Sequence, residues 1–533
     1  VEAKLSESVS VLDFVTIQQA IDSGQNLLWP PGDYSESTLN ITTANNDTVW
    51  SAYGAKLTLP SETNASQFII TGTERLTIFG MELDGNGANQ SLTTPAETSN
   101  GIAVSGDNVR DITVRDMYFH DFGLPTRDSE NPTRATDYNS GSGFIQASDS
   151  SVGIDRLTAT NCVFENVYIG FGVRGTGTKV TVSNCWFKHL GRNPVRTKRT
   201  EQVFIDGCYS EDTRGYESHC DYLKFTNNHS KNDYRHGVSG GVDFANIIGN
   251  TFINTDGTLT NQVYAIEIGL SSSCRVIGNY CKDWAGTSFI KMTDAANGSD
   301  STVIDSNVAE GCRTTDGLIG ASNSQDRVTI SNNIVHDCTD TARGIFKIDG
   351  ENWDIHGNKI TYLTGAALTD IDFAPFQGGS VGGSFSDNTI VMPTYVAGPD
   401  PLRSAVQISD LSRINNNTIK GSYLGFNARL NNCIGTGNIF EGTVNAFKNT
   451  DTGEGLVLIS NNFGAGVTPY DGTPVDGAAV FVGKTHSRNS APTDGDWLRH
   501  DKVWNTLASG GSPMGWICTV AGTPGTWTAM PNL

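Results

Sequence analysis

One side chain recurs at regular intervals through the second half of the chain. Asparagines stand in the same local frame, as in VTISNNIV, FSDNTI and RINNNTI, and successive members lie 21 to 30 residues apart. The series is Asn228, Asn250, Asn279, Asn307, Asn333, Asn358, Asn388, Asn417, Asn438 and Asn462. A repeat of this length with strand-like flanks is typical of a solenoid, in which each coil packs only against its neighbours. The sequence therefore predicts one long solenoid rather than several globular domains.

Cysteines occupy the same column earlier in the chain, at Cys162, Cys185 and Cys208. Asparagine suits a solenoid turn because it tolerates a left-handed backbone and its amide can hydrogen-bond from coil to coil, whereas free cysteine packs as a small hydrophobe. Cys312 and Cys338 each follow a column asparagine by five residues and predict a second stack. The ten cysteines show no CxxC pair, so we expect reduced, packed thiols and folding in a reducing compartment.

Composition excludes several functions. The 59 glycines and 37% hydrophobic content fit many short strands separated by turns, and a net charge of 36 − 57 = −21 argues against non-specific nucleic-acid binding. No apolar run has the length of a membrane span, and there is no HExxH motif or phosphate-binding GxxxxGK[ST] loop. We therefore expect no metal, no cofactor, no nucleic-acid partner and no membrane insertion.

Three regions follow along the chain. Residues 1–36 contain an amphipathic helical stretch, with Phe14, Ile17 and Ile21 at helical spacing, that is predicted to cap the open end of the solenoid. Residues 37–466 carry the coils. Residues 467–533 are predicted to form a small β-rich module for trimerisation or carbohydrate binding, because the repeat stops and tryptophans gather among glycines and prolines. These tryptophans are Trp497, Trp504, Trp516 and Trp527.

Two segments carry a resemblance to a known family. The opening SVLDFVTIQQAIDSGQNLLWPPGDY resembles the start of bacteriophage tailspike and pectin-lyase-like β-helix domains, although this chain has DFV where the family usually has DFG. The C-terminal GSPMGWICTVAGTPGTWTAM is similar to tail segments of phage tail-fibre and tailspike proteins. The resemblance implies an all-β fold, a right-handed single-stranded parallel β-helix with an N-terminal capping helix and a small C-terminal module.

The same resemblance implies a biological setting. Members of the family are homotrimers on the virion tail that bind or cleave bacterial capsule or O-antigen polysaccharide, by hydrolysis or by elimination, in a groove on one subunit or between subunits. Because this chain begins at Val1 rather than Met, we expect a missing N-terminal segment to join it to the tail or baseplate, after folding in the host cytoplasm. Fold does not decide between these chemistries.

Strand alternation predicts which side chains face outward. In YAIEIGL, Ile266 and Ile268 point inward and Glu267 outward, and in SFIKMTD, Lys291 points outward. Outward residues at equal distances before the asparagine column should stack about 4.8 Å apart. Arg196, Glu217, Ser239 and Glu267 lie 11 or 12 residues before it and are predicted to form such a stack.

The two glutamates of this stack form the first candidate catalytic pair. Glu217 and Glu267 are expected two coils apart, roughly 9–10 Å between backbones, with a small serine between them. Inverting glycosidases hold their carboxyl groups about 6.5–9.5 Å apart, one to protonate the leaving oxygen and one to activate water. The alternative is that exposed glutamates only keep the solenoid soluble.

Residues around the pair suit a sugar, particularly an acidic one, because arginine pairs bidentately with carboxylates and aromatic rings stack on sugar faces. The equal alternative is that the charged groups form ion pairs between coils and that Trp284 is a packed anchor. The candidate substrate-binding residues are Arg196, Lys198, His219, Tyr234, Arg235, His236, Trp284 and Lys291.

A second carboxylate pair is also possible. Asp221 and Asp243 each lie seven residues before a column asparagine, so they should stack about 5 Å apart at a turn, close to the separation of a retaining pair. Aspartate is common in turns for conformational reasons alone, which ranks this pair second. The insertion at 120–141 is expected to flank the groove or to contact another subunit.

Three functions remain open. The first is an endo-acting glycoside hydrolase that uses paired carboxylates. The second is a polysaccharide lyase, in which Arg or Lys neutralises a uronate while His219, Tyr234 or His236 removes the neighbouring proton. The third is a non-catalytic receptor-binding spike, for which changing the carboxylates would alter neither product nor adsorption.

Overall fold

The structure, a computed structural model, describes most of the chain. The described residues are 7–90, 99–106, 108–122, 141–146, 154–176, 178–256, 262–269, 272–293, 301–325, 327–340, 346–350, 353–362, 376–379, 383–392, 404–409, 411–421, 424–429, 434–442, 445–449, 456–459, 461–463, 467–471, 479–482, 485–494, 497, 499 and 501–532. The chain divides into two units, Val1–Asn297 and Gly298–Leu533, each taken here by itself. Most of the insertion at 120–141 lies outside the described residues.

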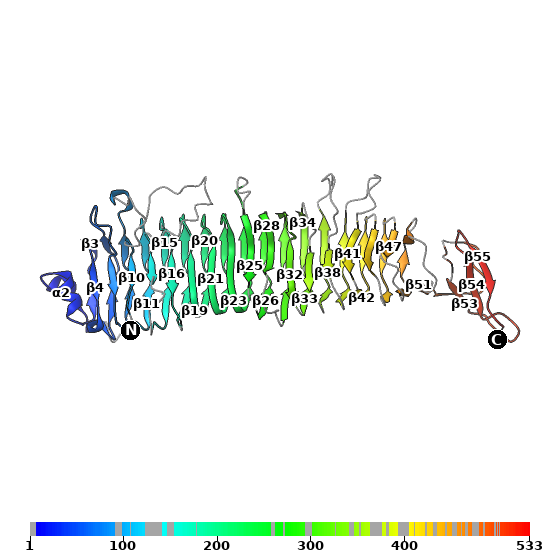
Figure 1. Ribbon diagram of the computed structural model, residues 1–533, viewed down its shortest axis with the longest axis horizontal. Helices are drawn as coiled ribbons and strands as arrows, with labels where there is room; N and C mark the ends of the chain where they lie inside the picture. Colours follow the sequence, from blue (N-terminus) through cyan, green and yellow to red (C-terminus); the bar gives the residue numbers. More distant parts are fainter. Residues whose placement is uncertain are drawn as a thin grey trace. The chain divides into compact units, whose positions relative to one another are not determined.

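Unit 1 is a parallel β-solenoid whose coils each contribute to three faces, with successive coils side by side in Figure 1. The first face precedes the Asn/Cys column: β2 (Leu27–Leu28), β5 (Val49–Ser51), β8 (Thr77–Phe79), β11 (Ile112–Arg115), β14 (Leu157–Thr160), β17 (Lys179–Ser183) and β26 (Ser273–Ile277). The second face follows the column: β3 (Gly32–Ser35), β6 (Ala55–Thr58), β9 (Glu82–Asp84), β12 (Tyr118–His120), β15 (Val163–Glu165), β18 (Trp186–Lys188), β20 (Tyr209–Glu211), β22 (His229–Lys231), β24 (Thr251–Ile253) and β27 (Tyr280–Lys282).

The third face of unit 1 carries the predicted stack. It consists of β4 (Leu39–Ile41), β7 (Phe68–Ile70), β10 (Ile102–Val104), β13 (Phe144–Gln146), β16 (Phe171–Arg174), β25 (Gln262–Gly269), β28 (Ala285–Thr293) and the N-terminal halves of β19 (Val195–Asp206), β21 (Tyr216–Thr226) and β23 (His236–Ile248). The C-terminal halves of these three long strands continue into the first face, where they pair with β17 and β26. The predicted parallel β-solenoid is thus confirmed in this unit.

Alternating side chains fill the core of unit 1. Rings from successive coils stack inside it, with centroids 4.7 Å apart for Phe119 and Phe164 and 5.0 Å apart for Phe164 and Phe187. Phe144 and Phe171 stack in the same way at 4.5 Å. Because these rings stack on rings of the neighbouring coil, the coils are held in one register, and that register aligns the outward side chains as well.

The N-terminal segment differs in part from expectation. It contains β1 (Val9–Ser10), the 3-10 helix η1 (Val11–Asp13) and the helix α2 (Ile17–Asp22). Thr16 caps α2, and Phe14 lies before the helix in extended backbone, so the prediction that Phe14 belongs to the helix is wrong. Ile21 is buried, and Gln18 exchanges hydrogen bonds with the backbone of Asn40. A capping role for this segment stays a prediction. Two further 3-10 helices are η2 (Thr43–Asn45) and η3 (Gly87–Asn89).

The asparagine column is a hydrogen-bonded ladder. In unit 1, Oδ1 of Asn250 accepts from the backbone N–H of Asn228 at 2.9 Å and from its Nδ2 at 3.1 Å, and Asn279 does the same for Asn250. Nδ2 of Asn250 also donates to the carbonyl of Phe225. The ladder residues have ordinary backbone; the left-handed conformation belongs to the residue before each, such as Asn227 and Gly249. The prediction that column residues supply that conformation is therefore wrong, and the amide contacts explain the asparagine.

Unit 2 repeats the three faces. Its first face contains β29 (Ser301–Asp305), β33 (Val328–Ser331), β36 (Asp354–His356), β39 (Gly383–Ser386), β42 (Leu411–Asn415), β45 (Ile434–Thr436), β48 (Leu456–Ile459) and β51 (Ala479–Val482). Its second face contains β30 (Val308–Glu310), β34 (Ile334–Asp340), β37 (Lys359–Tyr362), β40 (Thr389–Val391), β43 (Thr418–Lys420), β46 (Ile439–Glu441) and β49 (Asn462–Phe463). Its third face contains β31 (Arg313–Thr314), β32 (Ile319–Gln325), β35 (Phe346–Gly350), β38 (Phe376–Gly379), β41 (Ser404–Ser409), β44 (Leu424–Arg429), β47 (Asn445–Asn449) and β50 (Thr468–Asp471).

The ladder of unit 2 ends one residue earlier than predicted. Oδ1 of Asn461 accepts from the backbone N–H of Asn438 at 3.0 Å and from its Nδ2 at 2.8 Å. Asn462 is exposed and pairs in register with Ile439, the residue after Asn438. The assignment of Asn462 to the ladder is therefore wrong, because strand register rather than spacing decides between two adjacent asparagines.

The cysteines are packed as expected where they are described. Cys162, Cys185 and Cys208 are buried in the column, and burial, followed by the proximity of the other two thiols, raises the pKa of the Cys185 thiol well above its ordinary value. Cys312 and Cys338 form the second stack. All nine cysteines among the described residues are buried free thiols.

The solenoid continues beyond the predicted boundary at residue 466. Strands β50 and β51 still pair with coil strands β47 and β48. A separate four-stranded sheet follows, made of β52 (Thr485–Arg488), β53 (Lys502–Asn505), β54 (Gly515–Val520) and β55 (Thr526–Ala529). Trp497, Val503 and Cys518 form its core, with Trp516 and Trp527 packed against them. The boundary of the C-terminal module therefore moves to after Val482, and the role of that module stays a prediction.

In the described part of the chain, no helix is long and apolar enough to cross a bilayer.

Candidate active site

Five side chains form one column on the third face of unit 1. Strand register pairs Arg196 with Glu217, Glu217 with Ser239, Ser239 with Glu267, and Glu267 with Lys291. The sequence predicted the first four as a stack. These residues lie either 11 or 12 residues before their column residue. They still align because the pairing of the long strands includes a register shift between Lys198 and Thr200. The two glutamates therefore lie two strand spacings apart, about 9–10 Å between backbones.

Glu217 lies beside two basic side chains. Its Oε2 is 3.4 Å from Arg196 Nε, and its Oε1 is 3.7 Å from His219 Nε2. Burial alone would raise the pKa of Glu217, but the interaction with His219 and the charges of Arg196 and Arg192 outweigh it and lower that pKa to about 2. Glu217 is therefore a carboxylate at any ordinary pH.

Glu267 has a different environment. Ser239 Oγ donates a hydrogen bond to Glu267 Oε2 at 2.9 Å, and His236 Nδ1 lies 3.5 Å from the same oxygen. Burial raises the pKa of Glu267, and the charge of Glu217 raises it further, while Ser239, Arg235 and His219 oppose the rise only in part. Two chemically identical side chains thus have pKa values displaced in opposite directions, as an acid and a base sharing one site require.

His236 does not supply a balancing charge beside Glu267. Burial, followed by repulsion from Arg235 and Arg214, lowers the pKa of His236 to about 3. The ring is therefore neutral near neutral pH. Glu267 thus lies against a neutral ring and a hydroxyl, and Lys291 follows it in register on the next strand.

The buried carboxyl of Asp233 holds in place the segment that carries Tyr234 and Arg235. Asp233 Oδ1 accepts from the N–H and hydroxyl of Thr213 at 3.0 and 2.6 Å, and its Oδ2 accepts from the hydroxyls of Ser210 and Ser230. Burial raises the pKa of Asp233 to about 6, against the lowering effect of these hydrogen bonds. The next residue, Tyr234, donates its hydroxyl to the carbonyl of Gly191 at 2.9 Å. Tyr234 and Arg235 are thereby held next to the column.

The structure brings most of the predicted substrate-binding residues together. Lys198 and His219 pair in register on neighbouring coils and are exposed, and Tyr234, Arg235 and His236 follow on the next turn. Arg192 and Arg214 lie in the same stretch, and the sequence analysis assigned them no role. Backbone hydrogen bonds join both to the same stack of turns, from Arg214 N–H to Arg192 and from His236 N–H to Arg214.

Two predicted contacts with substrate do not fit the structure. Trp284 is completely buried, so its ring is a packed anchor and is not available to stack on a sugar. Lys291 stays in register with Glu267, but its exposed fraction is only 6%, so it does not face solvent as predicted. Alternation predicts the direction of a side chain from its strand, but it does not show what covers that side chain.

The second carboxylate pair lies inside long strands rather than at a turn. Asp221 and Asp243 occupy equivalent places, because their neighbours Cys220 and Tyr222 pair with Val242 and Phe244. Buried positions in β21 change phase here, from Tyr216, Ser218 and Cys220 to Leu223 and Phe225, so the strand bends without a turn. Both aspartates are exposed on the outside of this bend. They lack the enclosed setting of Glu217 and Glu267.

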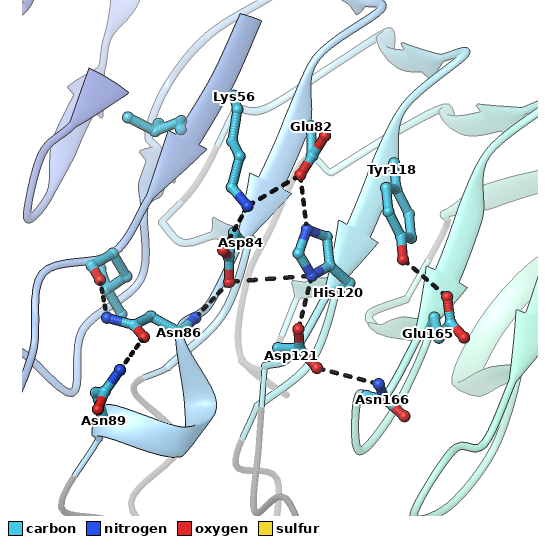
Figure 2. A network of polar contacts seen from close by, with 12 residues as sticks. Lys56, Glu82, Asp84, Asn86, Asn89, Tyr118, His120, Asp121, Glu165 and Asn166 are labelled. Atoms are coloured by element: carbon cyan, nitrogen blue, oxygen red, sulfur yellow. Dashed lines mark hydrogen bonds and ion pairs between the residues drawn. The ribbon is translucent and has the colours of Figure 1, made fainter. Parts of the chain in front are cut away.

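A separate polar network lies on the second face (Figure 2). Lys56 Nζ is 2.8 Å from Asp84 and 3.2 Å from Glu82, and His120 lies 3.1 Å from Glu82 and 2.8 Å from Asp121. Ligand atoms of Asp84, His120 and Asp121 lie within 4.8 Å of one another, a spacing that would suit a metal ion and that the sequence did not predict. Lys56 Nζ already contacts two carboxylates of this network, Glu82 and Asp84.

Comparisons with known proteins concern the fold. No protein-family model matches this sequence, and no curated protein sequence matches it significantly. Solved structures similar to the chain include phage proteins and enzymes that act on polysaccharides. The A-module of a mannuronan C-5 epimerase from Azotobacter vinelandii has 11% identity and a TM-score of 0.26, over 89% of this chain and 99% of that one.

Two phage structures belong to the same set. The pre-mature gene product 12 of bacteriophage phi29 has 14% identity and a TM-score of 0.40, over 88% of this chain and 74% of that one. A tailspike protein of E. coli bacteriophage HK620, in complex with a hexasaccharide, has 11% identity and a TM-score of 0.33, over 88% and 81%. At these values the likeness carries no argument about chemistry, which depends on the residues of this chain.

Proposed function

We propose that this protein is a tailspike-type depolymerase that hydrolyses a bacterial surface polysaccharide, with Glu267 as general acid and Glu217 as general base. One observation carries the proposal: two glutamates stand two strands apart in one column, with pKa values displaced in opposite directions. A solubilising role would not require enclosed carboxyls with contrasting environments. Perturbed groups of this kind cluster at functional sites.

The displaced pKa values assign the two roles. Protonated Glu267 donates its proton to the glycosidic oxygen as the bond to the anomeric carbon breaks. Ionised Glu217 removes a proton from water while the water oxygen bonds to that carbon from the opposite face. Glu267 ends as a carboxylate and Glu217 as a carboxylic acid, and each product gains a hydroxyl group.

The spacing favours inversion over retention. A direct attack by water requires room between carboxyl and sugar, and the two-strand separation of about 9–10 Å between backbones allows it, since flexible side chains can adjust this toward the inverting range of about 6.5–9.5 Å. A retaining pair would sit about 5–5.5 Å apart. The small Ser239 between the glutamates leaves space over the middle strand.

The biological setting rests on the sequence resemblance. The opening and C-terminal segments resemble phage tailspikes, and we infer a homotrimer on a virion tail that meets its host through capsule or O-antigen polysaccharide. The hydrolytic site itself is proposed on the flank of a single unit, independent of the oligomeric state.

Elimination is the second candidate, favoured by one feature. Arg214 and Arg235 stand close to the glutamates and beside the neutral His236, an arrangement that would neutralise a uronate and accept its neighbouring proton. With a pKa of about 3, however, His236 is a weak base for removing a proton from carbon. Hydrolysis by the glutamate pair therefore comes first.

Product masses separate the possibilities. The protein is incubated with candidate capsular and O-antigen polysaccharides, and the fragments are measured by mass spectrometry. Fragments heavier by one water than the internal repeat are expected from hydrolysis. Unsaturated fragments of unchanged repeat mass would replace the proposal with a lyase, and intact polymer that nevertheless binds would replace it with a receptor-binding spike.

A further inference from the structure

We propose that Arg214 and Arg235 form an anion-binding subsite beside the glutamate pair that takes the carboxylate of an acidic sugar. The inference deepens the proposed function and rests on it only in taking the bound acidic sugar to be part of a substrate. The subsite itself is defined by the two guanidinium groups. It names the class of polymer, an acidic polysaccharide, which the glutamates alone leave open.

The backbone brings the two arginines to adjacent turns of the solenoid. The N–H of His236 donates to the carbonyl of Arg214 at 3.0 Å, so Arg214 lies one coil from the residue that follows Arg235. The carbonyl of Arg235 accepts from the N–H of Val263 at 2.7 Å on the next coil. Both arginines thus lie on the turns leading into β21 and β23, which carry Glu217 and Ser239.

Neither guanidinium has a counter-ion within the described structure. Arg214 and Arg235 are half-buried, yet no described carboxylate lies at ion-pair distance from either, and neither side chain donates a hydrogen bond to a described residue. By contrast, Arg196 contacts Glu217 and Lys231 contacts Glu211 in the same region. Two partly buried guanidinium groups without a protein counter-ion are available to bind an anion through charge-assisted hydrogen bonds.

Repulsion adds to that cost. Burial lowers the pKa of Arg214, and the charges of Arg235 and Arg192 lower it further, with only Glu217 and Tyr234 acting in the opposite sense. Arg235 also acts on His236 and on Glu267. Arg214 thus interacts electrostatically with Glu217 and Arg235 with Glu267, and an anion bound between the two arginines would relieve the repulsion between them.

Arginine is suited to this ligand. Its planar fork binds a carboxylate through two parallel N–H···O contacts and fixes the orientation of the sugar that bears it. The chain as a whole carries a charge of −21, which repels a polyanion at long range. Capture of an acidic polymer therefore requires a local positive site, and this pair lies next to the proposed cleavage point.

The subsite is tested by binding, which requires no turnover. Titration calorimetry and thermal unfolding are run at low salt with tetragalacturonate, with neutral maltotetraose and with inorganic sulfate. We expect tetragalacturonate to bind and to raise the melting temperature, and maltotetraose to do neither. Arg214→Gln and Arg235→Gln should each weaken tetragalacturonate binding at least tenfold. Arg275→Gln, at an exposed arginine of β26, is the matched control and should bind like wild type.

Stability provides the second measurement. If Arg214 is kept for a ligand, Arg214→Gln removes a repelled charge and should raise the melting temperature of the free protein by a few degrees while abolishing the tetragalacturonate shift. A lower melting temperature of the free variant would assign Arg214 a structural role and overturn the proposal. Unchanged tetragalacturonate affinity in both variants, or equal loss in the Arg275→Gln control, would overturn it as well.

The outcomes also separate this inference from the proposed function. Sulfate binding that depends on Arg214 without tetragalacturonate binding would reject the carboxylate in favour of a sulfated polymer. Arginine-dependent tetragalacturonate binding with no cleavage of any polymer would keep the subsite and reject the hydrolase. Cleavage of a neutral polymer that is indifferent to Arg214→Gln would keep the hydrolase and reject the subsite.

Discussion

At the scale of single residues, the contrast between Glu217 and Glu267 comes from neighbours rather than from the side chains themselves. Arg196 and His219 face Glu217, whereas a serine hydroxyl and a neutral histidine face Glu267. The sequence predicted that the two glutamates share a column, because a fixed distance from the ladder fixes the register. It did not predict which of the two has the raised pKa, since that depends on burial and on groups brought from other turns.

Removing either carboxylate should abolish turnover while leaving substrate binding intact. Glu217→Gln loses the base and Glu267→Gln loses the acid, so each should lower kcat by about 10³-fold, within the range typical of general acid–base catalysis. Fragment release from the polysaccharide is the measurement. Glu201→Gln is the matched control, because Glu201 lies on β19 outside the column and faces Lys179. Near-wild-type rates in both column variants would exclude the pair.

The plot of kcat/KM against pH should be bell-shaped, with its maximum at acid pH. Glu217 must be ionised and Glu267 protonated, so kcat/KM should rise as pH passes about 2 and fall as pH passes the raised pKa of Glu267, above its ordinary 4.5. Ser239→Ala removes a hydrogen bond that lowers the pKa of Glu267. In the Ser239→Ala variant the falling limb of the pH profile should therefore move to higher pH by about 1 unit, as expected for one hydrogen bond to a charged group. A limb that moves downward would contradict the assignment of the acid.

At the scale of elements, the ladder and the long strands position the site. The ladder asparagines satisfy backbone N–H groups of the adjacent coil. Strands β19, β21 and β23 extend that order from the third face into the first, with a register shift between Lys198 and Thr200. Periodicity in the sequence was sufficient to predict the ladder. The bend at Asp221 and the burial of Lys291 and Trp284 were not predictable, because both depend on how strands of unequal length pack.

Adjacent asparagines in the last coils provide a test of ladder membership. Asn461→Ala leaves the backbone N–H and amide of Asn438 without their acceptor, which should lower the free energy of unfolding of this region by about 2 kcal/mol. Asn462→Ala changes an exposed side chain and should cost less than about 0.5 kcal/mol. Urea unfolding measures both. Equal losses in the two variants would contradict the observed register.

At the scale of the whole molecule, the C-terminal boundary has a practical consequence. A chain that ends after residue 484 keeps β50 and β51, whereas a chain that ends after residue 466 removes both and exposes the strands they pair with, β47 and β48. We expect the first to keep the melting temperature of the solenoid and the second to lose several degrees or to aggregate. Thermal unfolding followed by circular dichroism measures this. Equal melting temperatures would restore the boundary predicted from the sequence.

The most direct test of the paired glutamates is the fate of the attacking water. Cleavage is run in ¹⁸O-labelled water, and the new reducing end is followed by mass spectrometry and by NMR before it mutarotates. Hydrolysis across a two-strand separation predicts one ¹⁸O atom in each reducing end and an anomeric configuration opposite to that of the bond cleaved. A retained configuration, or unsaturated fragments without ¹⁸O, would contradict the account.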